Sequence, residues 1–313
     1  MIAAALVAWL IWDPAAVTDQ RFDRGRNGLW VGHQWYTGTK VGSGDPVPED
    51  ERQRFIETLR HQRIRYAFVH VGPLLDDGSV EDAAGPFFAR LRRQTPEIRY
   101  LAWLGGIAKR LPVEDAEWRT AVVQTAQHLG DEGFAGIHLN IEPLEDHHAG
   151  YLELLQALRE GLGQEYLLSH ATRRAGPFGF AVGPLGPLVW SEDFYKATME
   201  IVDQTVLMAY DTKMDVTKHY IGFVKYQTGL LVEWGCQATD HQVLIGIPSY
   251  EDVPLYSNPE IENISNAALG VRAALEELDS DHDCFEGVAV YANWVTDPGE
   301  WADYRNHWLE AMR

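Results

Sequence analysis

Short apolar runs alternate along the chain with longer segments in which apolar residues recur every three to four positions. The short runs predict eight β-strands, and the longer segments predict amphipathic helices. The expected strands are Gly28–Trp35, Ile64–Val71, Ile98–Leu104, Phe134–Glu142, Tyr166–His170, Gln204–Tyr210, Gln242–Tyr250 and Gly287–Trp294. Helices are expected over Arg52–His61, Tyr151–Leu162, Ala267–Leu278 and Trp301–Met312.

Eight strands that alternate with helices predict an α/β protein with the (β/α)8 TIM barrel fold. A doubly wound sheet would also alternate, but its first strand should lead through a glycine-rich turn into a helix. Here the segment Gly38–Gly44 has unsuitable glycine spacing and runs into Pro46. Since no linker or internal repeat interrupts the pattern, we expect a lead-in over residues 1–27 and a single barrel over residues 28–313.

The N-terminal segment Met1–Trp12 is continuously apolar. A bilayer-spanning helix needs about 20 apolar residues, so the segment is too short and no integral membrane span is expected. It is either the remnant of an export signal or anchor, or a strand that packs under the fold. The first alternative is favoured, and it favours secretion or the cell envelope over the cytoplasm.

Charge narrows the class of partner. The chain carries 46 acidic and 26 basic side chains, which gives a formal net charge of −20. Such a field repels nucleic acid and anionic membrane surfaces, whereas a neutral ligand such as a sugar is compatible with it. The two cysteines, Cys236 and Cys284, exclude a zinc ribbon, and they are either buried thiols or one disulfide.

The stretch from Gly133 to Pro143 is the most informative part of the chain. If it forms a strand, one face carries isoleucine and leucine, and the other carries His138, Asn140 and Glu142. An amphipathic edge strand would show the same alternation. However, Glu142 is followed by Pro143 and an acidic turn that leads into a helical segment, and chemistry is common where a strand ends and a helix begins. We therefore expect Glu142 to be functional.

In a barrel, side chains at the carboxyl ends of the strands converge on one pocket. Besides strand four, three predicted strands end in polar or aromatic groups. These strand ends contribute Met208, Tyr210 and Asp211, then Tyr250 and Glu251, and finally Tyr291 and Trp294.

Together these strand ends resemble glycoside hydrolase family 18, the chitinase and endo-β-N-acetylglucosaminidase family, which adopts the TIM barrel fold. Its Met-x-Tyr-Asp motif matches Met208–Asp211 in full, and its Gly-x-Pro-x-Tyr motif matches Gly246–Tyr250. Gly136 and Glu142 match the strand-four motif. The resemblance extends from about Gly28 to Trp294, although each motif alone has low specificity.

The departures lie on strands four and eight. Ala135, His138 and Asn140 replace the three aspartates of the family motif, and Tyr291 aligns with its strand-eight tryptophan. The arrangement Asn140-x-Glu142 instead resembles glycoside hydrolase family 85, in which an asparagine has the role of that aspartate.

The resemblance implies substrate-assisted hydrolysis of an oligosaccharide or polysaccharide that contains N-acetylglucosamine. Glu142 would be the acid and base, Asn140 would orient the 2-acetamido group, and Tyr210 would hydrogen-bond its carbonyl oxygen. Asp211 would support the substrate or a loop. The other candidate substrate-binding residues are Trp35, His138, Met208, Tyr250, Glu251, Tyr291 and Trp294. No metal or organic cofactor is implied, and the sequence leaves the glycan, endo or exo action and the oligomeric state open.

Several candidates also have a structural explanation. A lone His138 is more often a core histidine than a ligand, Met208 suits packing, and Asn140 could satisfy hydrogen bonds within the lumen. The turn Glu145–His148 fits a solvated helix start better than a metal site. The aromatic side chains could either bind sugar or fill the core; they are Trp35, Trp103, Tyr210, Tyr291 and Trp294.

Two other functions fit the same barrel. Glu142 could be the acid and Glu251 the nucleophile of an ordinary retaining glycosidase, although that layout normally places asparagine immediately before the acid, where this chain has Ile141. Alternatively, the loss of the motif aspartates could leave a weakly active, chitinase-like sugar-binding protein. The presence of Glu142 favours catalysis.

Overall fold

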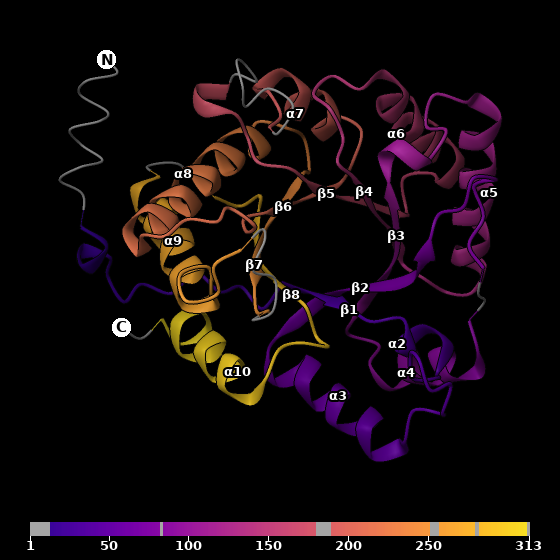
Figure 1. Cartoon of the computed structure of the whole chain (residues 1–313), viewed down its shortest axis with the longest axis horizontal. Coiled ribbons are helices and arrows are strands. Elements are labelled where there is room, and N and C mark those ends of the chain that lie inside the picture. Colours follow the sequence, from indigo (N-terminus) through magenta and orange to yellow (C-terminus); the bar gives the residue numbers. More distant parts are fainter. Residues whose placement is uncertain (1–12, 82–83, 180–188, 251–256, 279–281, 312–313) are drawn as a thin grey trace.

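The computed structural model describes residues 13–81, 84–179, 189–250, 257–278 and 282–311. Eight parallel strands close into a barrel in the order β1 to β8, and β1 pairs with β8. Figure 1 shows the barrel from one end, with the helices around it. The strands are β1 (Asn27–Val31), β2 (Ile64–Pro73), β3 (Arg99–Ile107), β4 (Gly136–Glu142), β5 (Leu167–Thr172), β6 (Gln204–Met208), β7 (Gln242–Pro248) and β8 (Phe285–Tyr291).

Helices connect successive strands, so the predicted (β/α)8 TIM barrel is confirmed. No helix in the described part of the chain is long and apolar enough to cross a membrane. The α-helices are α2 (Gln34–Thr37), α3 (Glu49–His61), α4 (Pro86–Gln94), α5 (Ala116–Asp131), α6 (Ala149–Leu162), α7 (Glu192–Met199), α8 (Thr217–Gly235), α9 (Ile264–Glu277) and α10 (Pro298–Tyr304). Short helical turns are η1 (Pro14–Ala16), η2 (Ala108–Arg110), η3 (Pro177–Gly179) and η5 (Arg305–Leu309), of which η5 is a π-helix.

All eight predicted strands exist, but several end earlier than predicted. β1 ends at Val31, and Trp35 lies in α2 instead of on the strand. Likewise β6, β7 and β8 end before Tyr210, Tyr250 and Trp294. In these strands, apolar and aromatic residues continue the sequence pattern past the last ladder hydrogen bond, whereas β2, β3 and β5 extend beyond their predicted ends. The last predicted helix is also interrupted, because α10 gives way to a π-helix at residue 305.

The alternation along β4 separates two cores. Ile137, Leu139 and Ile141 belong to the large core between the strands and the helices. A second, smaller core fills the barrel lumen and includes Trp30 and Phe68. The polar face of β4 therefore points into the lumen, as the sequence predicted.

Several polar side chains in the lumen form hydrogen bonds with one another. His138 Nδ1 lies 2.8 Å from Ser169 Oγ, which donates to Gln204, and Gln204 donates to Gln242. The Tyr66 hydroxyl continues the network by contacting both Gln242 and Glu286. Pairing of this kind removes most of the desolvation cost of buried polar groups, which explains why parallel strands here tolerate a polar face.

A disulfide joins Cys236 and Cys284, whose Cα atoms are 5.1 Å apart. The sequence left this pairing open. The bond ties the carboxyl end of α8 to the residue before β8, so it holds helix and strand together near the seam where the barrel closes.

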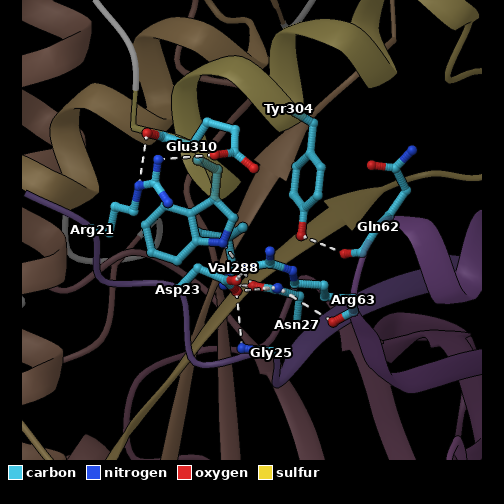
Figure 2. A network of polar contacts seen from close by, with 10 residues as sticks. Arg21, Asp23, Gly25, Asn27, Gln62, Arg63, Val288, Tyr304 and Glu310 are labelled. Atoms are coloured by element: carbon cyan, nitrogen blue, oxygen red, sulfur yellow. Dashed lines mark hydrogen bonds and ion pairs between the residues drawn. The ribbon is translucent and has the colours of Figure 1, made fainter. Parts of the chain in front are cut away.

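Asn27, the first residue of β1, connects the two ends of the chain (Figure 2). Its side-chain amide donates to Asp23, and its Oδ1 accepts hydrogen bonds from Trp308 Nε1 at 2.8 Å and the Val288 amide at 3.2 Å. Arg63 forms an ion pair with the same Asp23 at 2.7 Å. The buried Asn27 thus holds the amino end of the barrel against the C-terminal helical segment.

We expect Asn27→Ala to lower the free energy of unfolding by about 2–4 kcal/mol, because the buried donors of Trp308 and Val288 lose their acceptor. Denaturant unfolding followed by circular dichroism measures this. Glu57→Ala on the exposed face of α3 is the control and should change stability little. Equal stability of the two variants would contradict the assignment.

Candidate active site

Glu142 is the last residue of β4, and four further side chains surround the same mouth of the barrel. Asn140 lies two residues earlier on the same face of the strand. Three tyrosines come from the other side of the barrel. The Tyr291 ring centroid is 5.4 Å from that of Tyr210 and 6.0 Å from that of Tyr250. Glu142 interacts electrostatically with Asp211, Tyr210 and Tyr291, so the structure brings predicted residues of strands four, six and eight together, with Tyr250 of strand seven beside the other tyrosines.

Burial raises the pKa of the Glu142 carboxyl above its ordinary value. Hydrogen bonding from Asn140 and the positive charge of Arg173 act in the opposite direction, while the charge of Asp211 raises the pKa further. The net shift favours the protonated carboxyl, which is the form that a general acid needs at rest.

Asn140 and Tyr210 each carry a buried polar atom that has no hydrogen-bond partner among the described residues. These atoms are Asn140 Oδ1, an acceptor, and the Tyr210 hydroxyl, a donor. Asn140 is only 9% exposed and Tyr210 is buried. Buried polar groups are nearly always paired in native proteins, so this acceptor and this donor beside one carboxyl are available to a ligand.

Asp211 follows Tyr210 and adopts the left-handed conformation, with φ of 58°. Its Oδ1 accepts a hydrogen bond from the Tyr250 hydroxyl, and its backbone carbonyl accepts one from Arg174 at 2.5 Å. Burial raises the pKa of Asp211, whereas the Tyr250 hydrogen bond and Arg174 lower it. Asp211 thus connects the ends of β6 and β7 and contributes negative charge near Glu142.

Arg173 and Arg174 follow β5 directly and were not among the residues predicted from the sequence. Burial lowers the pKa of Arg173, and the charge of Glu142 raises it. Two adjacent arginines close to the carboxyl end of a predicted strand, in a chain with a net charge of −20, were a signal that could have identified them.

A cavity of about 570 Å³ adjoins the site on the side of β1, β2, β3 and β8. The rings of Trp103 and Trp294 contribute to its wall and are nearly parallel, with 13° between their planes and 6.3 Å between their centroids. Tyr291 contacts both rings, which connects the cavity to the site. Trp294 is 48% exposed, so one large aromatic face is available to a ligand.

Three other predicted residues, His138, Met208 and Trp35, have packing roles in the described structure. His138 is fully buried and stacks on Phe68 at 4.0 Å, which favours the core role over sugar contact. Met208 packs against the lumen core, and Trp35 stacks on Phe55 at 3.8 Å while contributing to the cavity wall. Glu251 lies outside the described residues.

The turn Glu145–His148 forms the start of a helix. His148 Nδ1 accepts a hydrogen bond from the Tyr151 amide and caps α6, and Asp146 accepts two from Ser191. Within the described ranges, no group of three or more acidic, histidine or cysteine side chains could hold a metal ion.

Comparisons with known proteins identify the fold. No protein-family model matches the sequence, and no curated protein matches it. The structure is similar to a family GH18 chitinase from Chromobacterium violaceum, with a TM-score of 0.60 and 16% identity over 94% of this chain and 90% of that one. It is also similar to the spore cortex-lytic enzyme SleL from Bacillus cereus, with a TM-score of 0.59 and 13% identity over 92% of this chain and 75% of that one. A third similar structure is that of a group IV chitinase from Ostrinia furnacalis in complex with allosamidin. Its TM-score is 0.58 and its sequence identity is 12%, over 92% of this chain and 100% of that one.

The raised pKa of Glu142 predicts a pH-dependent effect on stability. As the pH rises, the unfolded chain loses this proton before the folded protein does, so ionisation of Glu142 opposes folding. Glu142→Gln should therefore be more stable than the wild type at about pH 7.5, and the gain should disappear below about pH 4. Thermal unfolding across this pH range tests the sign.

The matched control is Glu145→Gln, which removes a carboxylate from an exposed position three residues away. It should leave the melting temperature nearly unchanged at both pH values. A Glu142→Gln protein that is less stable than the wild type at neutral pH would show that Glu142 is not held in an unfavourable charged state.

Proposed function

We propose that this protein is a retaining glycoside hydrolase that cleaves β-linked, N-acetylglucosamine-containing glycans by substrate-assisted catalysis. The observation that carries the proposal is the unpaired pair of buried atoms, Asn140 Oδ1 and the Tyr210 hydroxyl, beside the high-pKa carboxyl of Glu142. A 2-acetamido group offers the complementary N–H donor and carbonyl acceptor.

In the first step Glu142 donates its proton to the glycosidic oxygen as the bond from C1 to that oxygen breaks. The carbonyl oxygen of the 2-acetamido group attacks C1 and forms an oxazolinium ion. Asn140 Oδ1 accepts the acetamide N–H, which holds the group in position for attack. The Tyr210 hydroxyl donates to the acetamide oxygen and fixes its direction.

In the second step a water molecule attacks C1, and the bond from C1 to the acetamide oxygen breaks. Glu142, now ionised, accepts the proton of that water and regains its initial state. The positive charge of Arg173 stabilises the carboxylate between the two steps. Two successive displacements at C1 retain the β configuration.

The adjoining cavity supports a substrate of more than one sugar residue. Flat aromatic faces bind the apolar faces of sugar rings, and the exposed ring of Trp294, which lies beside the buried ring of Trp103, supplies one next to the site. Two of the similar structures are of proteins described as chitinases, and one is described as a spore cortex-lytic enzyme. Chitin oligosaccharides and peptidoglycan-type glycans are therefore the first substrates to test, followed by N-glycans.

Substitution of Glu142, Asn140 or Tyr210 should lower kcat/KM, with the largest loss at Glu142 and the smallest at Tyr210. Relative to the wild type on 4-nitrophenyl chitobioside, we expect Glu142→Gln to lower kcat/KM about 10²- to 10⁴-fold. Asn140→Ala should lower kcat/KM about 10²- to 10³-fold, and Tyr210→Phe about 10-fold or more, because each removes a contact that positions the nucleophile. Initial rates of nitrophenol release provide the measurement.

The matching 4-nitrophenyl cellobioside, which has the same two β-1,4-linked rings without the 2-acetamido groups, is the control substrate and should not be cleaved. Cleavage of both substrates at similar rates, with activity lost in Glu251→Gln and little changed in Asn140→Ala, would identify Glu251 as a protein nucleophile. Measurable binding of chitobiose without turnover of any substrate would make the protein a sugar-binding one.

A further inference from the structure

Glu262 is a buried carboxylate that lies between β7 and α9, outside the group of residues described above. It is 2% exposed. Its two oxygens accept hydrogen bonds from the backbone amides of Thr212 at 2.9 Å, Lys213 at 2.6 Å and Asn258 at 3.2 Å. Burial of a charged side chain is costly unless it is hydrogen-bonded, so this arrangement requires an explanation.

Glu262 holds the turn that follows β6 in an unfavourable backbone conformation. Asp211 and Lys213 have φ values of 58° and 54°, in the left-handed region that residues other than glycine rarely adopt. Such residues persist only where the surroundings hold them. The carboxylate binds the amide between them and the amide of Lys213 itself, so it binds the turn where strain is greatest.

A second set of contacts joins the same two loops. The side-chain amide of Asn258 donates to the Met214 carbonyl at 3.1 Å and to Asp215 at 3.3 Å. Asn258 also accepts a hydrogen bond from the Glu262 amide at 2.6 Å through its own carbonyl. The loop after β7 is thereby fastened to the loop after β6 by contacts in both directions.

The turn held in this way begins at the candidate active site. Asp211 follows Tyr210 in the chain, accepts a hydrogen bond from Tyr250 and receives one from Arg174 on its carbonyl. Burial lowers the pKa of Arg174, and the charge of Glu262, followed by that of Asp211, raises it again. Glu262 therefore acts on Asp211 through both the backbone of the turn and the arginine beside it.

We infer that Glu262 is a positioning residue, which fixes Asp211 and through it the Tyr210 and Tyr250 side chains in the catalytic arrangement. The inference rests on the proposed function for its consequence in catalysis, but the contact itself can be tested without activity. Removal of the carboxylate should release the turn, and Asp211 should then move away from Tyr250 and from Glu142.

Hydrogen exchange measured by mass spectrometry tests the contact. In Glu262→Gln, which loses one carboxylate acceptor, the amides of residues 211–214 should exchange about 10-fold faster or more than in the wild type. Glu260→Gln removes the same charge from an exposed position two residues away and should leave this segment unchanged. Unchanged exchange in Glu262→Gln would overturn the inference.

The pH profile of kcat/KM tests the consequence. Five side chains interact with Glu142, namely Asn140, Arg173, Tyr210, Asp211 and Tyr291. Among them, the negative charge of Asp211 makes Glu142 harder to ionise. The alkaline limb of the kcat/KM profile reports the ionisation of Glu142. In Asp211→Asn this limb should therefore move to lower pH. Glu262→Gln should move it in the same direction and lower kcat about 10- to 100-fold, whereas Glu260→Gln should do neither.

If Glu262 only stabilises the fold, Glu262→Gln should reduce the fraction of folded protein. It would then lower kcat/KM equally at every pH and leave the limbs of the pH profile in place, which would overturn the inference. If Glu262→Gln does not fold, Asn258→Ala weakens the same connection between the loops and gives both measurements. Absence of wild-type turnover on every glycan would contradict the proposed function alone. In that case the exchange of residues 211–214 still decides whether Glu262 holds the turn.

Discussion

Pairing of β1 with β8 is the interaction on which the site depends, because it brings strand ends that are distant in sequence to one mouth. The seam joins Gly28 to Ala289 and Leu29 to Val290. A Cβ atom on Gly28 would lie 2.9 Å from both Ala289 and the Phe68 ring, so only glycine allows this approach. Once the barrel closes, Trp30 fills the lumen and its ring lies 5.3 to 5.7 Å from Phe68, Tyr291 and His138.

Burial has a chemical consequence at the mouth above this aromatic layer. Burial is the largest cause of the raised pKa of Glu142 at the carboxyl end of β4. At the same mouth, Asn140 Oδ1 and the Tyr210 hydroxyl are buried without partners, which costs stability in the free protein. Functional sites commonly retain such costs, and a bound acetamido group would remove them. The raised pKa of Glu142 and the two unpaired atoms thus accompany burial at the same mouth of the barrel.

The barrel was predictable from the sequence because period-two and period-3.6 patterns directly reflect which side of a strand or helix is buried. The polar face of β4 and the convergence of Glu142 with Tyr210, Tyr250 and Tyr291 followed from the same rule. Loop residues have no such period, so Arg173, Arg174 and Glu262 were missed although all three act on the strand ends. Trp35 was misplaced for a related reason, since an apolar pattern does not show where ladder hydrogen bonds stop.

The central claim is that the acetamide oxygen of the substrate is the nucleophile. The most direct test compares kcat/KM for chitobiosides whose reacting N-acetyl group carries zero, one, two or three fluorine atoms. Fluorine withdraws electrons from the amide oxygen and weakens it as a nucleophile, so the account predicts a steep, progressive fall in kcat/KM across the series. A nearly flat series, with the fluorinated substrates cleaved as fast as the parent, would contradict the account.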